Sequence, residues 1–163
     1  ERVDAASDAD PELASLILRS VAGSRRKQHP ELSAAILPFT NHAEVGIRVD
    51  ASSALARVGG PEALTELDRL RRDSSIRVRY AALAAAIEID PDGAEERILE
   101  HTDDRFMTWR LVQHLKRHAT ARSLPFLRRT KAESGHRFAR RDAKKLIERL
   151  TRKRKGFARP GGP

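Results

Sequence analysis

The sequence at residues 47–64 reads IRVDASSALARVGGPEAL. Its apolar residues, beginning with Ile47 and Ala51, recur at the three- and four-residue spacing of one helix face. Gly59-Gly60 predicts the end of that helix, because a left-handed glycine closes a helix C-terminus without steric cost. Pro61 then suits the first position of a second helix, where its missing N–H group is not needed. The stretch therefore predicts two helices joined by a tight turn.

The same pattern returns along the chain. Ile47-Arg48-Val49 is matched one repeat later by Ile76-Arg77-Val78, and two further repeats along by His136-Arg137-Phe138. In the alternate helices, His29-Pro30-Glu31 is matched one repeat later by Gly60-Pro61-Glu62. A period of about 30 residues with two amphipathic segments predicts a helix-pair repeat. One pair cannot bury both of its apolar stripes, so successive pairs are expected to stack and share a core.

The predicted organisation is all-α, with four helix pairs followed by a terminal helix. The pairs lie near residues 11–40, 43–72, 75–101 and 105–131, and the terminal helix lies near 136–154. We expect residues 1–154 to form one repeat domain and residues 155–163 to form a basic tail that is disordered without a partner. Asp10 and Asp90, each followed by a proline, are expected to cap the helices that come next.

The repeat resembles a known family. The run from Ile47 to Leu64 is similar to the HEAT-like repeat best known from phycobilisome lyase proteins, although Gly60 stands where that pattern has Asp. The likeness extends through Ser75–Ile87 and is weaker elsewhere. It implies a right-handed α-solenoid of about four to five HEAT-like helix pairs, whose alternate helices line a concave face. Proteins with this repeat bind other proteins or nucleic acids, and few are enzymes, so the fold alone does not name a function.

Composition narrows the class of protein further. Aromatic residues make up 4% of the chain, and small aliphatic residues of this kind suit closely spaced helices better than a β-sandwich. No stretch approaches the roughly 18 apolar residues of a membrane-spanning helix. The chain has no Cys, so it offers no disulfide or thiolate chemistry, and we expect a cytoplasmic location. It begins at Glu1 rather than Met, and we expect a piece or a processed form of a longer protein.

Charge is divided unevenly along the chain. Residues 1–100 hold 13 Lys and Arg against 18 Asp and Glu, whereas residues 101–163 hold 19 against 5. The net charge of +9 therefore comes from the C-terminal part. Unless this charge serves solubility alone, it predicts an anionic partner, which can be nucleic acid, an acidic protein face or an anionic membrane.

The most basic segment is the predicted terminal helix. Its narrow apolar stripe lacks Trp and is needed to cap the repeats, so membrane binding is the least favoured of the three. No base-reading motif accompanies the cations, so binding to nucleic acid is expected to be sequence-independent. The residues expected to bind an anionic partner are Arg137, Arg140, Arg141, Lys144, Lys145, Arg149 and Arg152, with Arg128, Arg129 and Lys131 from the preceding helix.

A second set of cations is expected on the concave face of the solenoid, where it would hold an acidic protein segment. In the register of the repeat, this set consists of Arg69, Arg72, Arg97, Arg128 and Arg129.

Candidate catalytic and metal-binding residues are few. His114 and His118 share a helix face at a spacing that zinc ligands use, but the Lys and Arg between them make the site electropositive. His101-Thr102-Asp103-Asp104 combines a base with two carboxylates, yet it fits better an inter-repeat turn in which Asp caps the next helix. We expect no catalytic residue, no metal and no cofactor.

The resemblance implies two lower alternatives, both enzymatic. One class of DNA glycosylases built from HEAT-like repeats places an Asp and aromatic side chains around a cationic lesion. Asp103 or Asp104, with Phe106, Trp109 and Tyr80, offers these residue types, but the spacing matches no motif of that class. A bilin lyase or isomerase activity lacks support as well, because such enzymes favour a Cys-bearing partner and a second subunit.

Residues 105–115 depart from the Arg–Ala pattern of the earlier copies. Phe106, Met107 and Trp109 stand where those copies have small residues. We expect these three to fill a larger core; the alternative is an aromatic surface that contacts a partner.

The function expected from the sequence is that of a non-enzymatic HEAT-repeat adaptor or scaffold. It would bind a protein partner through the concave face and the basic C-terminal surface. The alternative is sequence-independent nucleic-acid binding through the basic C-terminal half. The acidic first part and the basic second part also permit head-to-tail self-association.

Overall fold

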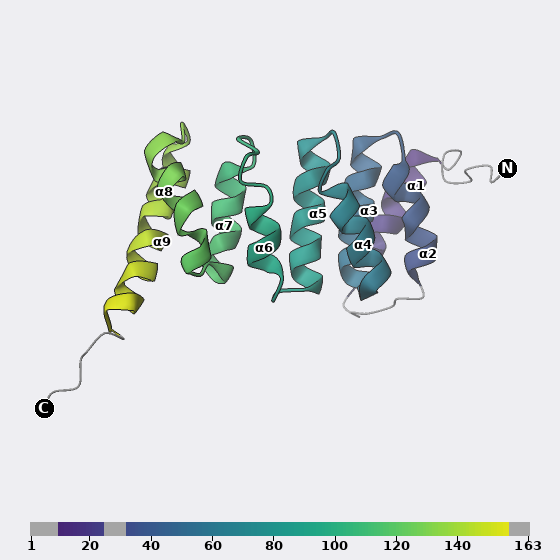
Figure 1. Cartoon of the computed structure of the whole chain (residues 1–163). Coiled ribbons are helices and arrows are strands. Elements are labelled where there is room, and N and C mark those ends of the chain that lie inside the picture. Colours follow the sequence, from purple (N-terminus) through teal and green to yellow (C-terminus); the bar gives the residue numbers. More distant parts are fainter. Residues whose placement is uncertain (1–9, 25–31, 157–163) are drawn as a thin grey trace, which may run out of the picture. The chain divides into compact units, whose positions relative to one another are not determined.

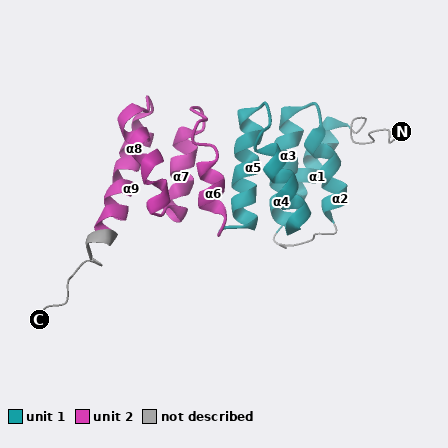
Figure 2. Ribbon diagram, in the orientation of Figure 1, with its two compact units in different colours: residues 1–91 teal, residues 92–163 magenta. Residues whose placement is uncertain are grey.

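The structure is a computed structural model that describes residues 10–24 and 32–156, with side chains as far as Arg152. Every regular element among these residues is a helix, which confirms the all-α prediction. The chain divides into two compact units, unit 1 at residues 1–91 and unit 2 at residues 92–163 (Figure 2). Among the described helices, none combines the length and the hydropathy that crossing a bilayer requires.

Unit 1 consists of two layers of helices (Figure 1). In one layer α3 packs between α1 and α5, and in the other α4 follows the 3₁₀ helix η2 and packs against α3 and α5. The elements are α1 (Pro11–Ala22), α2 (Ser33–Ile36), η2 (Leu37–Asn41), α3 (Val45–Val58), α4 (Gly60–Leu70) and α5 (Ile76–Ile89).

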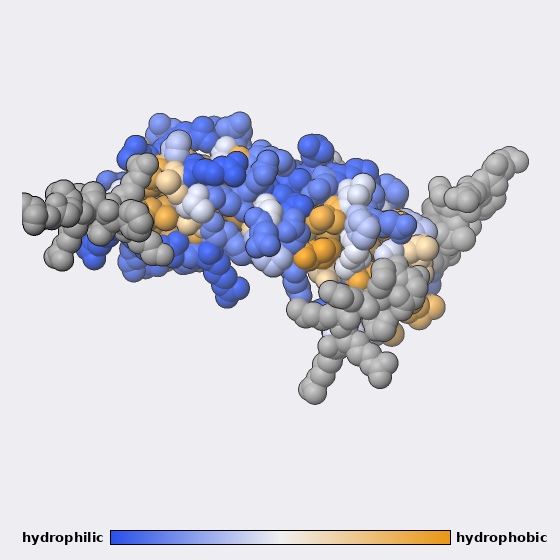
Figure 3. Space-filling model, turned by 60° about the horizontal axis from the view of Figure 1, so that its bottom comes forward, coloured by the Kyte–Doolittle hydropathy of each residue, from blue (hydrophilic) through white to orange (hydrophobic). Residues whose placement is uncertain are grey.

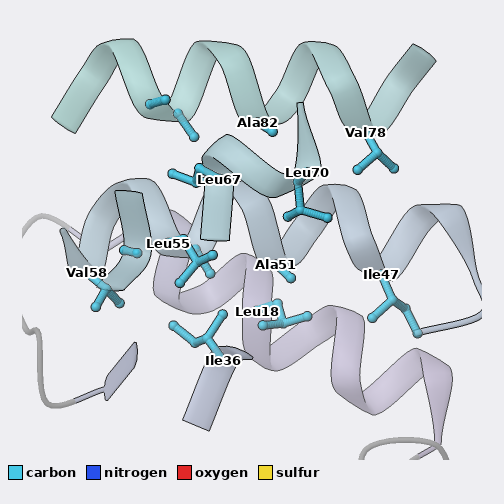
Figure 4. Close-up of a cluster of buried hydrophobic side chains, with 14 of the residues drawn as sticks. Leu18, Ile36, Ile47, Ala51, Leu55, Val58, Leu67, Leu70, Val78 and Ala82 are labelled. Carbon is cyan, nitrogen blue, oxygen red and sulfur yellow. The ribbon is translucent and has the colours of Figure 1, made fainter. Parts of the chain in front are cut away.

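The core of unit 1 lies between these layers. Leu18 of α1, Leu55 of α3 and Leu67 of α4 are almost wholly buried and lie in one cluster (Figure 4). Ala51 on α3 and Ala82 on α5 are both inaccessible to solvent. Such small side chains let neighbouring helices approach closely, which explains why these alanine-rich helices need few aromatic residues in their core.

The turn between α3 and α4 depends on glycine. Gly59 has φ 73° and ψ −165°, and Gly60 has φ 86°. The predicted helix end at this pair is confirmed, but Gly59 does not adopt the left-handed helical conformation. It lies in a region of positive φ and extended ψ that essentially only glycine occupies. Pro61 lies in the first turn of α4 but is its second residue, one position later than predicted.

The two predicted aspartate caps have different outcomes. Asp10 caps α1, because its Oδ1 accepts the N–H of Glu12 at 2.9 Å. The prediction for Asp90 is wrong, because α6 begins only at Ala94 and Asp90 instead stands directly after the last residue of α5. The residues between them form a bend and a turn, so Pro91 does not begin a helix.

Unit 2 packs its last helix against two others. α9 packs on α7 and α8, and α7 also packs on α6. Ile98, Met107, Leu111, Leu115 and Leu127 are fully buried between these helices. The elements are α6 (Ala94–Leu99), α7 (Thr108–His118), η3 (Ala121–Ser123), α8 (Leu124–Glu133) and α9 (Arg137–Gly156). The helix expected to end at 154 thus continues to Gly156, while residues 157–163 and the expected helix start at Pro30 lie outside the described residues.

One turn geometry recurs before α3, α5, α7 and α9. The side chains of His42, Asp73, Asp104 and Ser134 each accept the N–H group two residues further on, over 2.7–3.2 Å. Along the sequence, these four residues follow one another at intervals of 31, 31 and 30 positions. A capped turn of the same kind therefore precedes each of these four helices.

An arginine six positions further on holds three of these turns. Arg48 donates to the carbonyl of His42 at 2.8 Å, Arg79 to that of Asp73 at 3.0 Å, and Arg140 to that of Ser134 at 2.6 Å. Arg48 thus corresponds to Arg79, so the sequence alignment of Arg48 with Arg77 is wrong by two positions. Arg77 is exposed instead.

Candidate anion-binding surface of unit 2

The basic face of α9 is built by the amphipathic pattern of the helix. Ala139, Ala143 and Leu146 are buried where α9 packs on its neighbours. Outside this buried stripe, the described part of α9 carries only one exposed carboxylate, that of Glu148. Its exposed cations are Arg137, Arg140, Arg141, Lys144, Lys145, Arg149 and Arg152, which we call the α9 basic face.

Asp142 is the acidic residue that interrupts this pattern, and it is buried. Its carboxylate accepts from Lys116 Nζ at 2.8 Å, from Gln113 Nε2 at 2.9 Å and from Arg141 Nε at 3.2 Å. Burial alone raises the pKa of this carboxyl, but the hydrogen bonds from Lys116, Gln113 and Arg141 outweigh it and lower the pKa to about 2. Asp142 thus stays ionised and joins α7 to α9.

Some cations of the α9 basic face are held by backbone carbonyls. Arg140 donates to the carbonyl of Ser134 at 2.6 Å, and Arg149 donates to the carbonyl of Lys116 at 2.7 Å. Lys116 lies in the last turn of α7, where a cation stabilises the exposed carbonyls and the negative end of the helix dipole. A carbonyl leaves the guanidinium charged, so these arginines contribute to the local potential while their positions are fixed.

Exposed aromatic side chains gather at the starts of α7 and α9. Phe106 is 84% exposed, Trp109 39% and Phe138 40%. Trp109 stacks on His136 with ring centroids 5.4 Å apart, and His136 lies 5.8 Å from Phe138. We call these four residues the aromatic cluster. The larger core expected here is confirmed for Met107, which is fully buried, but is wrong for Phe106 and Trp109.

Two arginines cover one ring of this cluster. The guanidinium carbons of Arg137 and Arg141 lie 4.6 and 5.2 Å from the centroid of the Phe138 ring. These are cation–π distances. The aromatic cluster and the α9 basic face therefore meet at the first turn of α9.

An open cleft of about 840 Å³ lies beside the aromatic cluster. Its walls come from the turn before α7, from α8 and from the turn before α9. Phe106 and His136 line it, together with hydroxyl groups and side chains of both charges. Arg129 is fixed in this wall by the carbonyl of Thr102 at 2.9 Å and by Asp103 at 3.4 Å.

The other predicted binding residues are distributed over both units. Arg128 and Lys131 are exposed on α8, in unit 2. Arg97 is half-buried on α6. Arg69 and Arg72 belong to unit 1, where Arg69 is paired with Glu66. Because α8 packs on α9, the predicted residues of these two helices lie on neighbouring elements of unit 2, whereas Arg69 and Arg72 belong to unit 1.

The contacts of the residues considered for catalysis or metal binding are those of a helix and of a turn. Burial lowers the pKa of His114, and the charges of His118 and Arg117 lower it further. Asp104 accepts the N–H of Phe106 in its turn. In the part of the chain that is described, no three His, Asp or Glu side chains are grouped as metal ligands would be.

Sequence reasoning missed two buried carboxylates, Asp142 and Glu95, and one aromatic partner, His136. Glu95 accepts from Thr120 and Ser123, and although burial raises its pKa, these hydrogen bonds lower it. This contact ties α6 to the start of η3. His136 was noted only as part of a repeat, whereas it stacks on Trp109. Its place two positions after a capping Ser134 is the signal that marks it as a turn residue.

Comparison with protein-family models, with curated proteins and with solved structures gives no match for this chain. The site is therefore interpreted from its geometry alone.

Proposed function

We propose that this protein is a non-enzymatic binding module of HEAT-like helix pairs, arranged as a right-handed α-solenoid, and that unit 2 binds the phosphate backbone of nucleic acid. The capped turn supports the repeat, because the same hydrogen bond occurs before α3, α5, α7 and α9 at intervals of about 30 residues. The packing of α3 between α1 and α5 is also what stacked helix pairs require.

The observation that carries the binding proposal is the α9 basic face. Its arginines and lysines recur three or four positions apart, so a row such as Arg137, Arg141 and Lys145 places one cation about every 6 Å along the helix. Burial of Asp142 against Lys116 removes the nearest carboxylate from this surface. Lys and Arg in such a row neutralise phosphates and release the counterions around them, whatever the base sequence.

A protein partner is the second candidate, and the cleft of unit 2 supports it. Phe106 at its wall has the exposed aromatic ring that often anchors protein interfaces. Asp103 and Glu133 in the same wall oppose Arg105 and Arg129, so the cleft itself is not strongly basic. An adaptor would hold a peptide there. We place nucleic acid before the protein partner, the reverse of the order expected from the sequence, because the exposed side chains of α9 include seven cations and only one carboxylate in the described part of the helix.

Fluorescence anisotropy with labelled nucleic acid tests the proposal. The wild-type protein should bind at about 50 mM salt and lose affinity steeply towards 200 mM, as phosphate contacts do. The double variant Lys144→Glu/Lys145→Glu should bind at least about tenfold more weakly and show a salt slope smaller by about 2. Both lysines are exposed, so circular dichroism should show unchanged helicity.

The matched control is Arg19→Glu/Arg77→Glu. Both arginines are exposed in unit 1, and the formal charge changes by the same amount. This control should retain wild-type affinity and salt slope. Equal losses of affinity in the two double variants would mean that binding depends on the net charge of the protein and not on the α9 basic face. Absence of binding at low salt would rule out the phosphate-binding surface and leave the protein partner.

A further inference from the structure

We infer that the aromatic cluster of unit 2 stacks the unpaired bases of a single-stranded nucleic acid whose phosphates lie along the α9 basic face. This inference rests on the proposed function and adds the kind of strand. In this cluster Trp109, His136 and Phe138 are in ring contact, and Phe106 lines the same cleft as His136.

The exposure of these rings is the first argument. Among the described residues, the Phe and Trp side chains that are exposed all lie in this cluster, whereas Phe39 and Tyr80 are half-buried and Phe126 is buried. Leaving a large apolar ring in water forgoes the free energy that its burial would contribute. Hydrophobic residues form only separate patches on the largely hydrophilic face seen in Figure 3. A gathering of exposed rings beside cations is typical of single-strand binding surfaces.

The geometry of the rings is the second argument. Trp109 and His136 are inclined by only 22°, so the cluster already holds two flat rings in a stack. The ring of Phe106 is 84% exposed in the wall of the cleft, so a nucleic-acid base can reach it. Arg137 and Arg141 lie against Phe138, and guanidinium planes also stack on bases. His136 covers one face of Trp109 and two arginines lie over Phe138, so Phe106 offers the ring that is most accessible to a base of a strand along the α9 basic face.

The charges of the cleft indicate which part of the strand enters it. Asp103 and Glu133 in the cleft wall repel phosphates, but their oxygens accept hydrogen bonds from the N–H groups of bases, including the ring N–H of thymine. The hydroxyl groups of Thr108 and Ser134 line the same wall. The α9 basic face carries only one exposed carboxylate, Glu148, among its described side chains. Bases thus fit the cleft side of the cluster, and phosphates fit the helix side.

Single strands are favoured over duplexes for a simple reason. In a duplex the base faces are already stacked on one another, so exposed aromatic rings gain nothing from them. In a single strand each base face is free, and stacking on an aromatic side chain is sequence-tolerant. The aromatic cluster should therefore discriminate between the two forms even though the α9 basic face attracts both.

Trp109 provides the measurement, because it is the only Trp of the chain. Addition of an oligothymidine of about 12 nucleotides, within the usual range of site sizes, should quench its fluorescence. A hairpin duplex with the same number of phosphates should not. Anisotropy should show the single strand bound about tenfold more tightly than the duplex, as expected from one stacked base.

Phe106→Ala isolates the stacking contribution. Since this ring is 84% exposed, its removal leaves the fold intact. The variant should lose about tenfold in affinity for the single strand and keep its affinity for the duplex. Phe106→Trp should restore single-strand binding. The control Leu16→Ala removes an exposed apolar side chain of unit 1 and should change neither affinity.

The outcomes separate this inference from the proposed function. Equal, salt-sensitive binding of both forms with unchanged Trp109 fluorescence would overturn the inference and leave phosphate binding intact. Quenching by poly-glutamate to the same extent would also overturn it, in favour of an acidic protein segment. Absence of binding to either nucleic acid at low salt would overturn both the inference and the proposed function.

Discussion

At the scale of single residues, Asp142 links the stability of unit 2 to its surface charge. It is the buried acid of an otherwise basic helix, and Lys116 and Gln113 of α7 satisfy its carboxylate. The side chain of Asp142 is 5% exposed and that of Lys116 44%, so loss of Lys116 would leave a buried carboxylate without its charged partner, whereas loss of Asp142 returns Lys116 to solvent. Asp142 therefore holds α9 in the orientation that exposes its cations.

The first prediction concerns Asp142→Asn. The pKa of this carboxyl falls from 3.8 to about 2 on folding, which corresponds to about 2 kcal/mol of stability. Because the folded-state pKa is the lower one, this contribution is complete above about pH 4 and is lost as the pH falls through about 2. The variant should thus be less stable by about 2 kcal/mol at pH 7, with a difference that shrinks towards zero near pH 2.

Urea denaturation at pH 7, 4 and 2 measures this difference. Glu148→Gln serves as the control, because Glu148 is exposed on the same helix and should show little change at any pH. A difference between Asp142→Asn and the wild-type protein that stays constant over this range would contradict the assigned role.

At the scale of elements, the capped turns before α3, α5, α7 and α9 show which residues of these helices correspond to one another. The sequence alignment followed the similar triplets Ile47-Arg48-Val49 and Ile76-Arg77-Val78. The structure instead equates Arg48 with Arg79, since both bind the carbonyls of the preceding turn. Residue identity is a weak guide here, because two-residue shifts on an Arg- and Ala-rich helix preserve most of the pattern.

The second prediction concerns Gly59→Ala at the turn between α3 and α4. A Cβ atom is strained at φ 73° and ψ −165°, so the variant should lose about 1–3 kcal/mol in unfolding free energy. Gly46→Ala is the matched control. It lies in the first turn of α3, where a Cβ atom meets nothing within 4 Å. That substitution should stabilise by up to about 1 kcal/mol.

Chemical denaturation of the two alanine variants measures both effects. Opposite signs are expected. A neutral Gly59→Ala would mean that the turn relaxes to a conformation that other residues adopt, and the direct connection between α3 and α4 would not need glycine.

At the scale of the whole molecule, the two units differ in core and in charge. The cluster around Leu18, Leu55 and Leu67 belongs to unit 1, and the one around Leu111 and Leu127 belongs to unit 2. The basic residues concentrate in unit 2, as the division of charge along the sequence predicted. Each unit therefore has a core of its own, and the proposed binding surfaces depend on the second.

The third prediction uses hydrogen exchange to test this division. Leu55→Ala should cost about 3 kcal/mol, because Leu55 is fully buried. Amide protection should fall in α1, α3 and α5 and persist in α7, α8 and α9. Leu115→Ala in unit 2 should give the reverse pattern. Equal loss of protection in both units from either variant would show that they unfold as one.

The sequence by itself determined the helices, their approximate ends and the location of the basic segment. These follow from local signals: apolar spacing, Gly59-Gly60, Pro61 and the run of Lys and Arg near the C-terminus. The helix start expected at Asp90-Pro91 failed because a bend and a turn intervene before α6. Local signals bound such elements only approximately.

Only the tertiary structure decided which side chains are exposed and which meet. Phe106 and Met107 are adjacent, yet one is 84% exposed and the other fully buried. Trp109 and His136 stack although they lie far apart in the sequence, and Asp142 is buried because α7 presents Lys116 and Gln113 to it. Spacing along one helix specifies a face, but the neighbouring helices determine whether that face meets protein or solvent.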